Sequence, residues 1–270
     1  MTEPEHFHDG DARAAWNQAA EAWEDFVESG KDYYRDEIHG PALLAVCEPL
    51  SGLRVLDLGC GQGYFTRQLA KRGAHVVGVD IADEMLALAR QHEKEDPLGI
   101  EYRQMSAAEV HRRWPTGSFD LVAGLMSLHD MAEPETVLRS AYAALKPAGR
   151  MAFVIPHPAT DTPYREWEVD KNGTRGALKI NHYFESGPTV LHWTMKRLIY
   201  HWDTPYWRHT LTEWSEMIAA SGFLIRRIYE PRPTPEQVRH NPHVEDAFRL
   251  PYALLFELVK PAVQLGLPSA

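Results

Sequence analysis

The stretch Val55–Phe65, VLDLGCGQGYF, decides the fold of this 270-residue chain. Apolar residues typical of a buried strand lead to Asp57, and three glycines then stand at alternate positions, Gly59, Gly61 and Gly63. Glycine lets the backbone between a parallel strand and the next helix approach a ligand closely. The stretch therefore predicts a strand, a ligand-binding turn bare of side chains, and the start of a helix.

The spacing of these glycines distinguishes between two nucleotide-like ligands. A dinucleotide-binding turn has the pattern G-x-G-x-x-G with its last glycine inside the helix. This chain has G-x-G-x-G, followed directly by Tyr64 and Phe65. The Asp57 carboxylate would repel a pyrophosphate, but it suits a ligand that carries an ammonium or a sulfonium group. The turn therefore favours S-adenosylmethionine over NAD, and a nicotinamide oxidoreductase is the disfavoured alternative.

Strand and helix patterns alternate on both sides of this turn. We expect strands at 54–58, 75–79, 100–104, 120–125 and 150–155, with helices at 64–72, 83–93 and 134–145 and a short helix within 107–114. A helix at 211–221 and strands at 223–229 and 253–259 complete the pattern. Such alternation implies parallel pairing with right-handed crossovers. The predicted fold class is α/β, a doubly wound, Rossmann-like seven-stranded sheet whose last strand is antiparallel.

Composition and charge narrow the class of partner. The chain is 44% hydrophobic and 24% charged, and its formal net charge of −10 disfavours a nucleic-acid surface built from lysine and arginine. Cys47 and Cys60 are too few for a disulfide scaffold and indicate a reducing compartment. The acidic N-terminus has no apolar core for a signal peptide, and no apolar run reaches the length of a membrane span. We therefore expect a cytoplasmic protein that acts on a small molecule.

Four motifs, in order along about Leu53–Ile155, carry a family resemblance: VLDLGCGQGYF, VVGVDIADEMLALAR, FDLVAGLMSLHDM and LKPAGRMAFVIPHP. Together they resemble class I S-adenosylmethionine-dependent methyltransferases, especially the small-molecule branch akin to ubiquinone and menaquinone biosynthesis methyltransferases. The resemblance implies a methyltransferase with S-adenosyl-L-methionine as its cofactor. Two alternatives are a non-catalytic protein that binds this cofactor and a methyltransferase of macromolecules, which the acidic charge disfavours.

The resemblance also implies roles for individual residues. Asp80 ends the second strand, about 20 residues after the glycine turn, where a carboxylate accepts hydrogen bonds from ribose hydroxyls. Ser106 and Ala107 stand where the family usually has an Asp-Ala pair at the adenine edge, so a neutral hydroxyl replaces a carboxylate there. The other cofactor residues that the resemblance implies are Asp57, Gly59, Cys60, Gly61 and Gly63 at the methionine half, Ile81 and Met85 at the adenine, and Met126 beside the methionine arm.

Two histidines are candidates for a general base. Methyl transfer from a sulfonium is an in-line displacement that depends on proximity and exclusion of water, and a base is needed only where the acceptor loses a proton. His129 follows the fourth strand and His157 the fifth, at the sheet edge where ligands bind. Because histidine titrates near neutral pH, we expect His129, and then His157, to serve O-methylation. A hydrogen-bonded loop histidine is the alternative role, and N- or C-methylation the alternative reaction.

Domain boundaries follow from where the alternation begins and stops. We expect an N-terminal helical cap at 1–50 with helices at 11–29 and 41–48, an S-adenosylmethionine-binding methyltransferase domain at 51–155 and 210–262, and an aromatic-rich substrate lid insertion at 156–209. Period-two stretches in the lid predict antiparallel strands with a hairpin turn at 186–188. Its aromatic residues would form the wall of a hydrophobic acceptor site, or else the lid's own core or a homodimer interface: Tyr183, Phe184, Trp193, Tyr200, Trp202 and Trp207.

Two features outside the motifs complete these expectations. In the N-terminal cap, we expect Tyr33, with its neighbours Tyr34 and Arg35, to close over the cofactor. We expect no metal, because the pairs His6 with His8 and His240 with His243 have no third ligand near them in the sequence.

Overall fold

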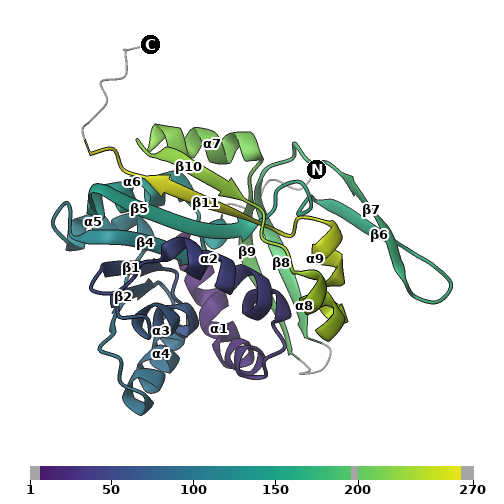
Figure 1. Cartoon of the computed structure of the whole chain (residues 1–270), viewed down its shortest axis with the longest axis horizontal. Helices are drawn as coiled ribbons and strands as arrows, with labels where there is room; N and C mark the ends of the chain where they lie inside the picture. The colour runs from purple at the N-terminus through teal and green to yellow at the C-terminus, as the bar shows by residue number, and fades with distance from the viewer. Residues whose placement is uncertain (1–6, 196–199, 263–270) are drawn as a thin grey trace, which may run out of the picture.

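A mixed seven-stranded sheet forms the centre of the protein. The computed structural model describes residues 7–195 and 200–262, and the strand order is β10-β11-β5-β4-β1-β2-β3 (Figure 1). Strands β3, β2, β1, β4 and β5 are parallel, and β11 pairs antiparallel with both β5 and β10. The strands are β1 Arg54–Leu58, β2 His75–Asp80, β3 Glu101–Gln104, β4 Phe119–Leu125, β5 Leu145–Pro156, β10 Leu224–Tyr229 and β11 Ala253–Val259. The predicted fold class is confirmed.

Helices cover both faces of this sheet because the strands are apolar on both sides. Val55 of β1 packs with Phe65 and Leu69 of α3 on one face, whereas Leu56 and Leu58 belong to the core under α5, α6 and α7 on the other. Strands buried on both faces are typical of parallel sheets. The helices flanking the sheet are α2 Gly40–Cys47, α3 Tyr64–Ala70, α4 Asp83–Glu95, α5 Val110–Arg113, α6 Pro134–Ala144 and α7 Leu211–Ala220, with short 3₁₀ turns η2 Ala107–Glu109 and η3 Leu128–Asp130.

The N-terminal segment folds over the carboxyl ends of the strands. Helix α1, Asp9–Glu28, contacts α4 and the strand β9 described below. A π-helical turn, η1 Arg35–His39, then continues into α2. Both predicted N-terminal helices are confirmed, while the π-turn that brings Arg35 inward was not predicted. Among the described residues, no helix has both the length and the apolar character of a membrane span.

The insertion between β5 and α7 consists of two hairpins. Strands β6 Tyr164–Val169 and β7 Arg175–Asn181 form an arm that projects from the body, and β8 Gly187–Met195 pairs with β9 Tyr200–Arg208 beside α1 (Figure 1). The predicted hairpin turn at 186–188 is wrong, because Gly187 begins β8 and pairs with Arg208. The first hairpin turns at Asp170, whose Oδ1 accepts the backbone N–H groups of Asn172 and Thr174, each at 2.8 Å.

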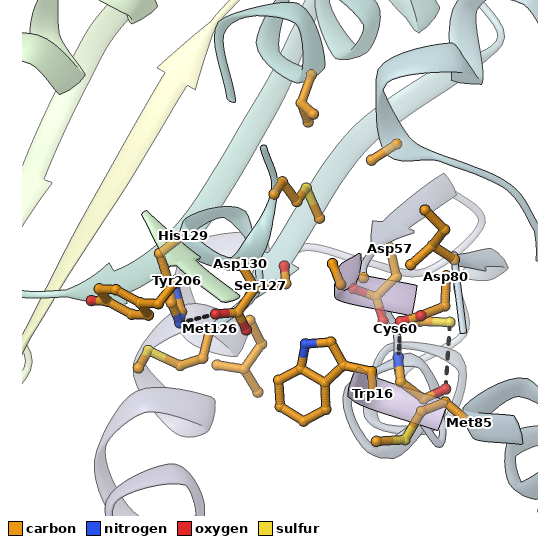
Figure 2. Close-up of a pocket in the computed structure, with 18 of the residues that line it drawn as sticks. Trp16, Asp57, Cys60, Asp80, Met85, Met126, Ser127, His129, Asp130 and Tyr206 are labelled. Carbon is orange, nitrogen blue, oxygen red and sulfur yellow. Dashed lines mark hydrogen bonds and ion pairs between the residues drawn. The ribbon is translucent and has the colours of Figure 1, made fainter. Parts of the chain in front are cut away.

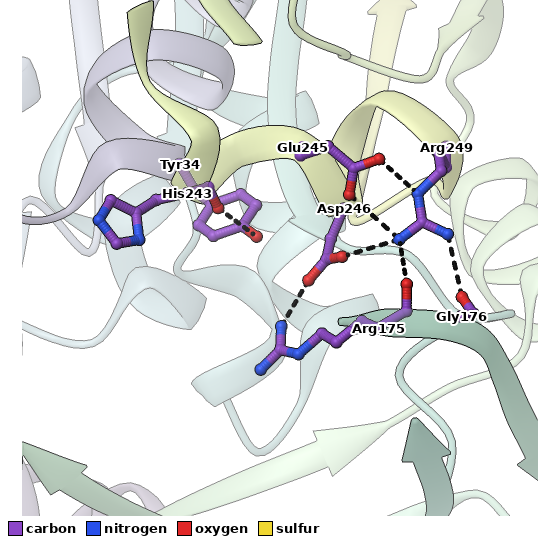
Figure 3. A network of polar contacts seen from close by, with 7 residues as sticks. All are labelled: Tyr34, Arg175, Gly176, His243, Glu245, Asp246 and Arg249. Carbon is purple, nitrogen blue, oxygen red and sulfur yellow. Dashed lines mark hydrogen bonds and ion pairs between the residues drawn. The ribbon is translucent and has the colours of Figure 1, made fainter. Parts of the chain in front are cut away.

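A polar network joins the projecting arm to the segment between β10 and β11. That segment contains α8 Pro235–His240, η4 Pro242–Val244 and α9 Glu245–Arg249. Asp246 of α9 pairs with Arg175 of β7, and the Arg249 guanidinium donates to the Gly176 carbonyl at 2.9 Å (Figure 3). Tyr34 donates to the His243 carbonyl at 3.3 Å, so the same segment also contacts the N-terminal cap.

Candidate active site

A cavity of about 980 Å³ opens at the carboxyl ends of β1, β2, β4 and β5. Ligands of open α/β sheets bind at this edge, and the volume is at the upper end of the usual range for small-molecule sites. Helix α1, the π-turn η1 and the hairpin β8–β9 supply its other walls. Figure 2 shows Trp16 of α1, Asp57 of β1, Asp80 of β2 and His129 of η3 around this space. The cavity is therefore assembled from segments more than 100 residues apart.

The three glycines of the turn occur for different structural reasons. All three have positive φ angles, 65° at Gly59, 53° at Gly61 and 88° at Gly63. A side chain at Gly59 would approach the Ser127 Cβ to 2.6 Å, and one at Gly63 would collide with the Tyr102 hydroxyl. At Gly61 a Cβ would meet nothing within 4 Å. Gly61 thus presents its bare backbone to open space. Gly59 also lines the cavity, but it and Gly63 permit close packing within the protein.

Two buried carboxylates hold the turn in shape. Asp80 Oδ2 accepts the Gly61 N–H at 2.8 Å and Oδ1 accepts the Ala82 N–H at 2.9 Å. Asp57 Oδ2 accepts the Thr66 hydroxyl at 2.7 Å. Burial raises the pKa of Asp57 to about 7 and also raises the pKa of Asp80. A cationic ligand in this cavity would favour the ionised form of both groups.

Buried polar atoms without partners surround the far end of the glycine turn. Arg35 Nη1, His39 Nε2 and both amide atoms of Gln62 make no hydrogen bond in the described part of the chain, and all three residues line the cavity. The Arg35 guanidinium lies 4.1 Å from the Tyr64 ring centroid, which fixes its position. Unpaired buried polar groups cost free energy unless a ligand satisfies them. A ligand with both anionic and cationic groups, such as the amino-acid part of S-adenosylmethionine, fits this set.

The opposite end of the cavity suits an adenine ring. Ile81 and Met85 supply apolar walls, and Ala107 lies beside them. The Ser106 hydroxyl donates to Asp9 Oδ2 of α1 at 2.6 Å. A carboxylate from the N-terminal helix, 97 residues away in the sequence, thus lies beside position 106, where the family usually has a carboxylate.

His129 and Asp130 lie side by side in the cavity. His129 Nε2 is 3.7 Å from Asp130 Oδ1, and His129 Nδ1 is buried without a hydrogen-bond partner in the described ranges (Figure 2). Burial lowers the pKa of His129 to about 3, so its ring is neutral. Burial, with Asp80 and Asp161 nearby, raises the pKa of Asp130 well above its ordinary value. A neutral imidazole and a carboxyl that holds a proton readily are thus adjacent where the fourth strand ends.

The hairpin β8–β9 adds to this corner. The Tyr206 hydroxyl donates to Asp161 Oδ2, and the Tyr206 ring centroid is 5.2 Å from that of His129. Trp193 lines the cavity together with Trp16 and Trp23 of α1, with ring centroids 5.5–6.5 Å apart in edge contacts. The hairpin β8–β9 and the N-terminal helix therefore meet in one aromatic cluster.

Most of the predicted cofactor residues line this cavity, and some predicted residues do not. The cavity is lined by Asp57, Gly59, Cys60, Gly61, Asp80, Ile81, Met85, Ser106, Ala107, Met126, His129 and Trp193. His157 lies outside it, where Nδ1 accepts the Ala159 N–H and Nε2 contacts Glu230, each at 3.1 Å. Tyr33 stacks on His243 instead, and Trp202 is stacked behind Trp193 with ring centroids 5.7 Å apart.

Three further predicted lid residues are placed differently from one another. The Tyr183 hydroxyl accepts the Leu211 N–H at 3.0 Å, and Phe184 is 87% exposed, so neither lines the cavity. The side chain of Tyr200 is outside the described part of the chain. Residues that line the cavity and were not assigned to it from the sequence include Asp9, Trp16, Gln62, Asp130 and Tyr206, and Arg35, which we expected to close over the cofactor, also lines it. Gln62 and Asp130 had neighbouring signals in the sequence, because Gln62 lies within the glycine turn and Asp130 directly follows His129.

Known proteins share this fold. The family model described as a methyltransferase domain matches residues 56–153. A solved S-adenosylmethionine-dependent methyltransferase from Mesorhizobium loti is 30% identical, with a TM-score of 0.69, over 81% of this chain and 96% of that one. The chain belongs to the S-adenosylmethionine-dependent methyltransferases, and S-adenosylmethionine is its cofactor. Within them it has the class I fold that the seven-stranded sheet defines.

Two further comparisons concern the type of acceptor. A ubiquinone biosynthesis O-methyltransferase of Pseudomonas aeruginosa is 38% identical over 102 residues, which are 38% of this chain and 44% of that protein. The chain thus spans less than half the length of the curated relatives it matches. The solved 1,6-didemethyltoxoflavin-N1-methyltransferase of Burkholderia thailandensis, with bound S-adenosylhomocysteine, is 16% identical and shares the fold with a TM-score of 0.57 over 96% of this chain and 93% of that one.

Proposed function

We propose that this protein transfers a methyl group from S-adenosylmethionine to an oxygen of a small aromatic or hydrophobic acceptor. The observation that carries the proposal is the pair of His129 and Asp130. This pair lies in the same cavity as the glycine turn and the tryptophan cluster, which consists of Trp16, Trp23 and Trp193. Oxygen acceptors must lose a proton, whereas a neutral amine attacks without a base. A neutral imidazole beside a carboxyl group in this cavity can accept that proton, so the pair favours O-methylation.

Different residues of the cavity would bind different parts of the cofactor. Arg35 and Gln62, with their unpaired buried atoms, would hold the amino-acid part of the cofactor, and Asp80 would accept the ribose hydroxyls. Asp9 would accept a hydrogen bond from the adenine amino group, the part that the family's usual acidic residue plays. When bound, the cofactor supplies a methyl group on a positively charged sulfur. The glycine turn and Met126 would keep that end open toward the acceptor.

His129 would take the acceptor's proton as the carbon–oxygen bond forms and the carbon–sulfur bond breaks. Its Nδ1 has no protein partner in the described chain, so it is free to accept the proton. Burial weakens the imidazole as a base and also raises the pKa of Asp130. The mechanism therefore requires Asp130 to be ionised beside Nε2 when the acceptor is bound, where it would stabilise the imidazolium that forms. The aromatic walls exclude water and align the acceptor for in-line attack.

We also propose that the hairpin β8–β9 is the part of segment 156–209 that acts as the substrate lid. Leu191, Trp193 and Tyr206 come from this hairpin and line the cavity, whereas the arm β6–β7 contributes none of its apolar side chains to it. Residues 1–50 would form the cap over the cofactor, and 51–155 with 210–262 the catalytic domain. Trp202 would support Trp193 from behind.

The compartment and assembly are part of the same proposal. Cys47 and Cys60 are both buried free thiols, which fits a reducing cytoplasm. Apolar side chains on the edge strand β10, among them Ile228 and Tyr229, are exposed and would suit pairing of two copies. Sedimentation of the purified protein tests that assembly.

The experiment that tests the function begins with cofactor binding. Calorimetric titration with S-adenosylmethionine, S-adenosylhomocysteine and NAD should show saturable binding of the first two alone, weakened in Asp80→Ala. A panel of phenols, carboxylic acids and amines is then screened by mass spectrometry for addition of one methyl group. Methylated phenols with loss of turnover in His129→Ala would support the proposal. Methylation of amines alone, or near-normal turnover of His129→Ala, would contradict it.

A further inference from the structure

Carboxylates outnumber cationic side chains around the cavity. Eight aspartates and glutamates line it, against three arginines, and no lysine among the described residues does so. Each of these arginines already pairs with a carboxylate: Arg35 with Asp36 at 2.8 Å, Arg112 with Glu109 at 2.6 Å and Arg165 with Asp161 at 3.3 Å. S-adenosylmethionine carries an ammonium, a sulfonium and one carboxylate, so it contributes a single net positive charge. A surplus of acidic groups therefore remains for the acceptor.

Asp130 is the cavity carboxyl with the least compensation. Its one ion-pair contact in the described chain is to the neutral ring of His129 at 3.7 Å. The charged and titratable groups that face it are acidic or neutral: Asp80 from β2, Asp161 from the loop after β5 and Tyr206 from β9. Only 9% of the His129 side chain is exposed, and its Nδ1 has no hydrogen-bond partner within the described ranges. This corner thus has unused hydrogen-bonding capacity as well as acidic charge.

Aromatic side chains lie around the same corner. Trp16, Trp23 and Trp193 form an edge-to-face cluster that lines the cavity, and the Tyr206 ring packs on His129. Figure 2 shows the Trp16 indole and the Asp130 carboxyl extending into the same space. Indole faces attract cations through their quadrupole, most strongly where water is excluded. Carboxyl groups beside tryptophan rings are the combination that recognises an organic ammonium ion.

We propose that the acceptor carries a cationic amine, held by Asp130 against the tryptophan cluster. The inference rests on the proposed function, because it takes this cavity to be where the acceptor binds. An ammonium held by a carboxylate keeps its proton, so its nitrogen has no lone pair to receive a methyl group. The amine therefore serves as a handle, and the methyl group goes to an oxygen elsewhere on the acceptor. The acceptor class is an aromatic or hydrophobic hydroxy-amine.

Binding of such a cation has a proton signature. Burial, with Asp80 and Asp161 nearby, raises the pKa of Asp130, so its carboxyl holds a proton more readily in the empty cavity than in water, and a neighbouring ammonium stabilises the ionised form. An ammonium ligand should therefore release a proton as it binds, whereas a neutral ligand of the same shape should not. The heat of binding of the cation then depends on the ionisation heat of the buffer.

The test uses three probes that share a phenol ring and a chain of the same length. Tyramine ends in an ammonium, para-propylphenol in a methyl group and phloretate in a carboxylate. Each is titrated calorimetrically into the full protein saturated with S-adenosylhomocysteine, in two buffers of different ionisation heat. Asp130→Asn removes the proposed partner, and Glu133→Gln is the matched control because Glu133 lines the same cavity on the adjoining loop.

Tyramine should bind about tenfold or more tightly than para-propylphenol, and phloretate more weakly than both, since close charge pairs at interfaces have coupling energies of about 1.5 kcal/mol upward. Asp130→Asn should abolish this preference and the buffer dependence, and Glu133→Gln should keep both. Equal or tighter binding of para-propylphenol or phloretate, a preference that survives Asp130→Asn, or no binding of any probe would overturn the proposal. S-adenosylhomocysteine binding is measured first, and its failure would instead refute the proposed function together with this inference.

Discussion

Replacing Arg35 tests the reasoning about the buried polar atoms most directly. Arg35 enters the cavity from the π-turn η1, and its Nη1 makes no hydrogen bond within the described residues, with Asp32 Oδ2 at 3.8 Å as its ion-pair contact. If it binds the carboxylate of the cofactor, Arg35→Gln should weaken binding of every ligand that carries this carboxylate. Ligands without the carboxylate should be unaffected.

The size of the effect follows from the type of hydrogen bond. A hydrogen bond to a charged group contributes about 1.5–3 kcal/mol, more than a neutral one because the charge strengthens it. Loss of that contribution should raise the Kd of S-adenosylhomocysteine roughly 10- to 150-fold. Arg35 is also buried beside Asp32 and Asp36, so the variant should melt at a lower temperature than the wild type.

The assay separates lost binding from lost folding. Calorimetry compares S-adenosylhomocysteine with methylthioadenosine, which has the same nucleoside and thioether but no amino-acid part. Arg35→Gln should lose affinity for the first and retain affinity for the second. Arg112→Gln is the control, because Arg112 lines the cavity but pairs with Glu109 at the surface. Equal losses for both ligands, or no loss for S-adenosylhomocysteine, would refute the assignment of Arg35.

Three further outcomes are expected. Gly61→Ala should cost about 1–2 kcal/mol of stability, because alanine is strained at the left-handed φ of this position. Gly59→Ala should cost more, because the added Cβ also collides with Ser127. Similar losses of stability in the two variants, measured by thermal melting, would contradict this difference. The folded-state pKa of Asp57 is raised from 3.8 to about 7, so the unfolded chain loses this proton at a lower pH than the folded protein does. The free energy of unfolding of the cofactor-free protein should therefore fall as pH rises across that window. Chemical denaturation of Asp57→Asn should show a flatter pH profile there, and an unchanged profile would argue against a buried, neutral Asp57. Arg175→Gln should increase amide hydrogen exchange in the arm β6–β7, which is otherwise exposed on both faces; exchange equal to that of the wild type would show that the Asp246 contact does not hold the arm.

The fold was predicted correctly where the strands are buried, because buried strands have a simple pattern of apolar residues in the sequence. Strands β1, β2 and β4 are apolar on both faces and are bounded by glycines and polar residues, so their limits were predicted to within a residue. The lid was harder, because exposed strands lack a consistent apolar face. The turn at Asp170 depends on hydrogen bonds to one carboxylate oxygen, while Ser186-Gly187-Pro188 has turn-forming residues but begins a strand.

The candidate site divides in the same way. The cofactor residues that follow β1 and β2 were predictable, because the carboxyl ends of adjacent parallel strands meet at one edge and a local motif marks them. For Arg35 the sequence indicated only a place in the N-terminal cap, since a π-turn decides that its side chain is buried. Asp9 could not be assigned, because its contact with Ser106 spans 97 residues.

By itself, then, the sequence determined the class of fold, the cofactor and the half of the cavity that holds it. These features depend on short segments whose residues act on their neighbours in the chain. Only the tertiary structure decided the corner of the cavity that we propose for the acceptor, where Trp16 of α1, Asp130 of η3 and Tyr206 of β9 come together. The charge and burial of these side chains depend on neighbours from distant segments. A shifted pKa, or a buried atom without a hydrogen bond, arises only once those segments are packed together.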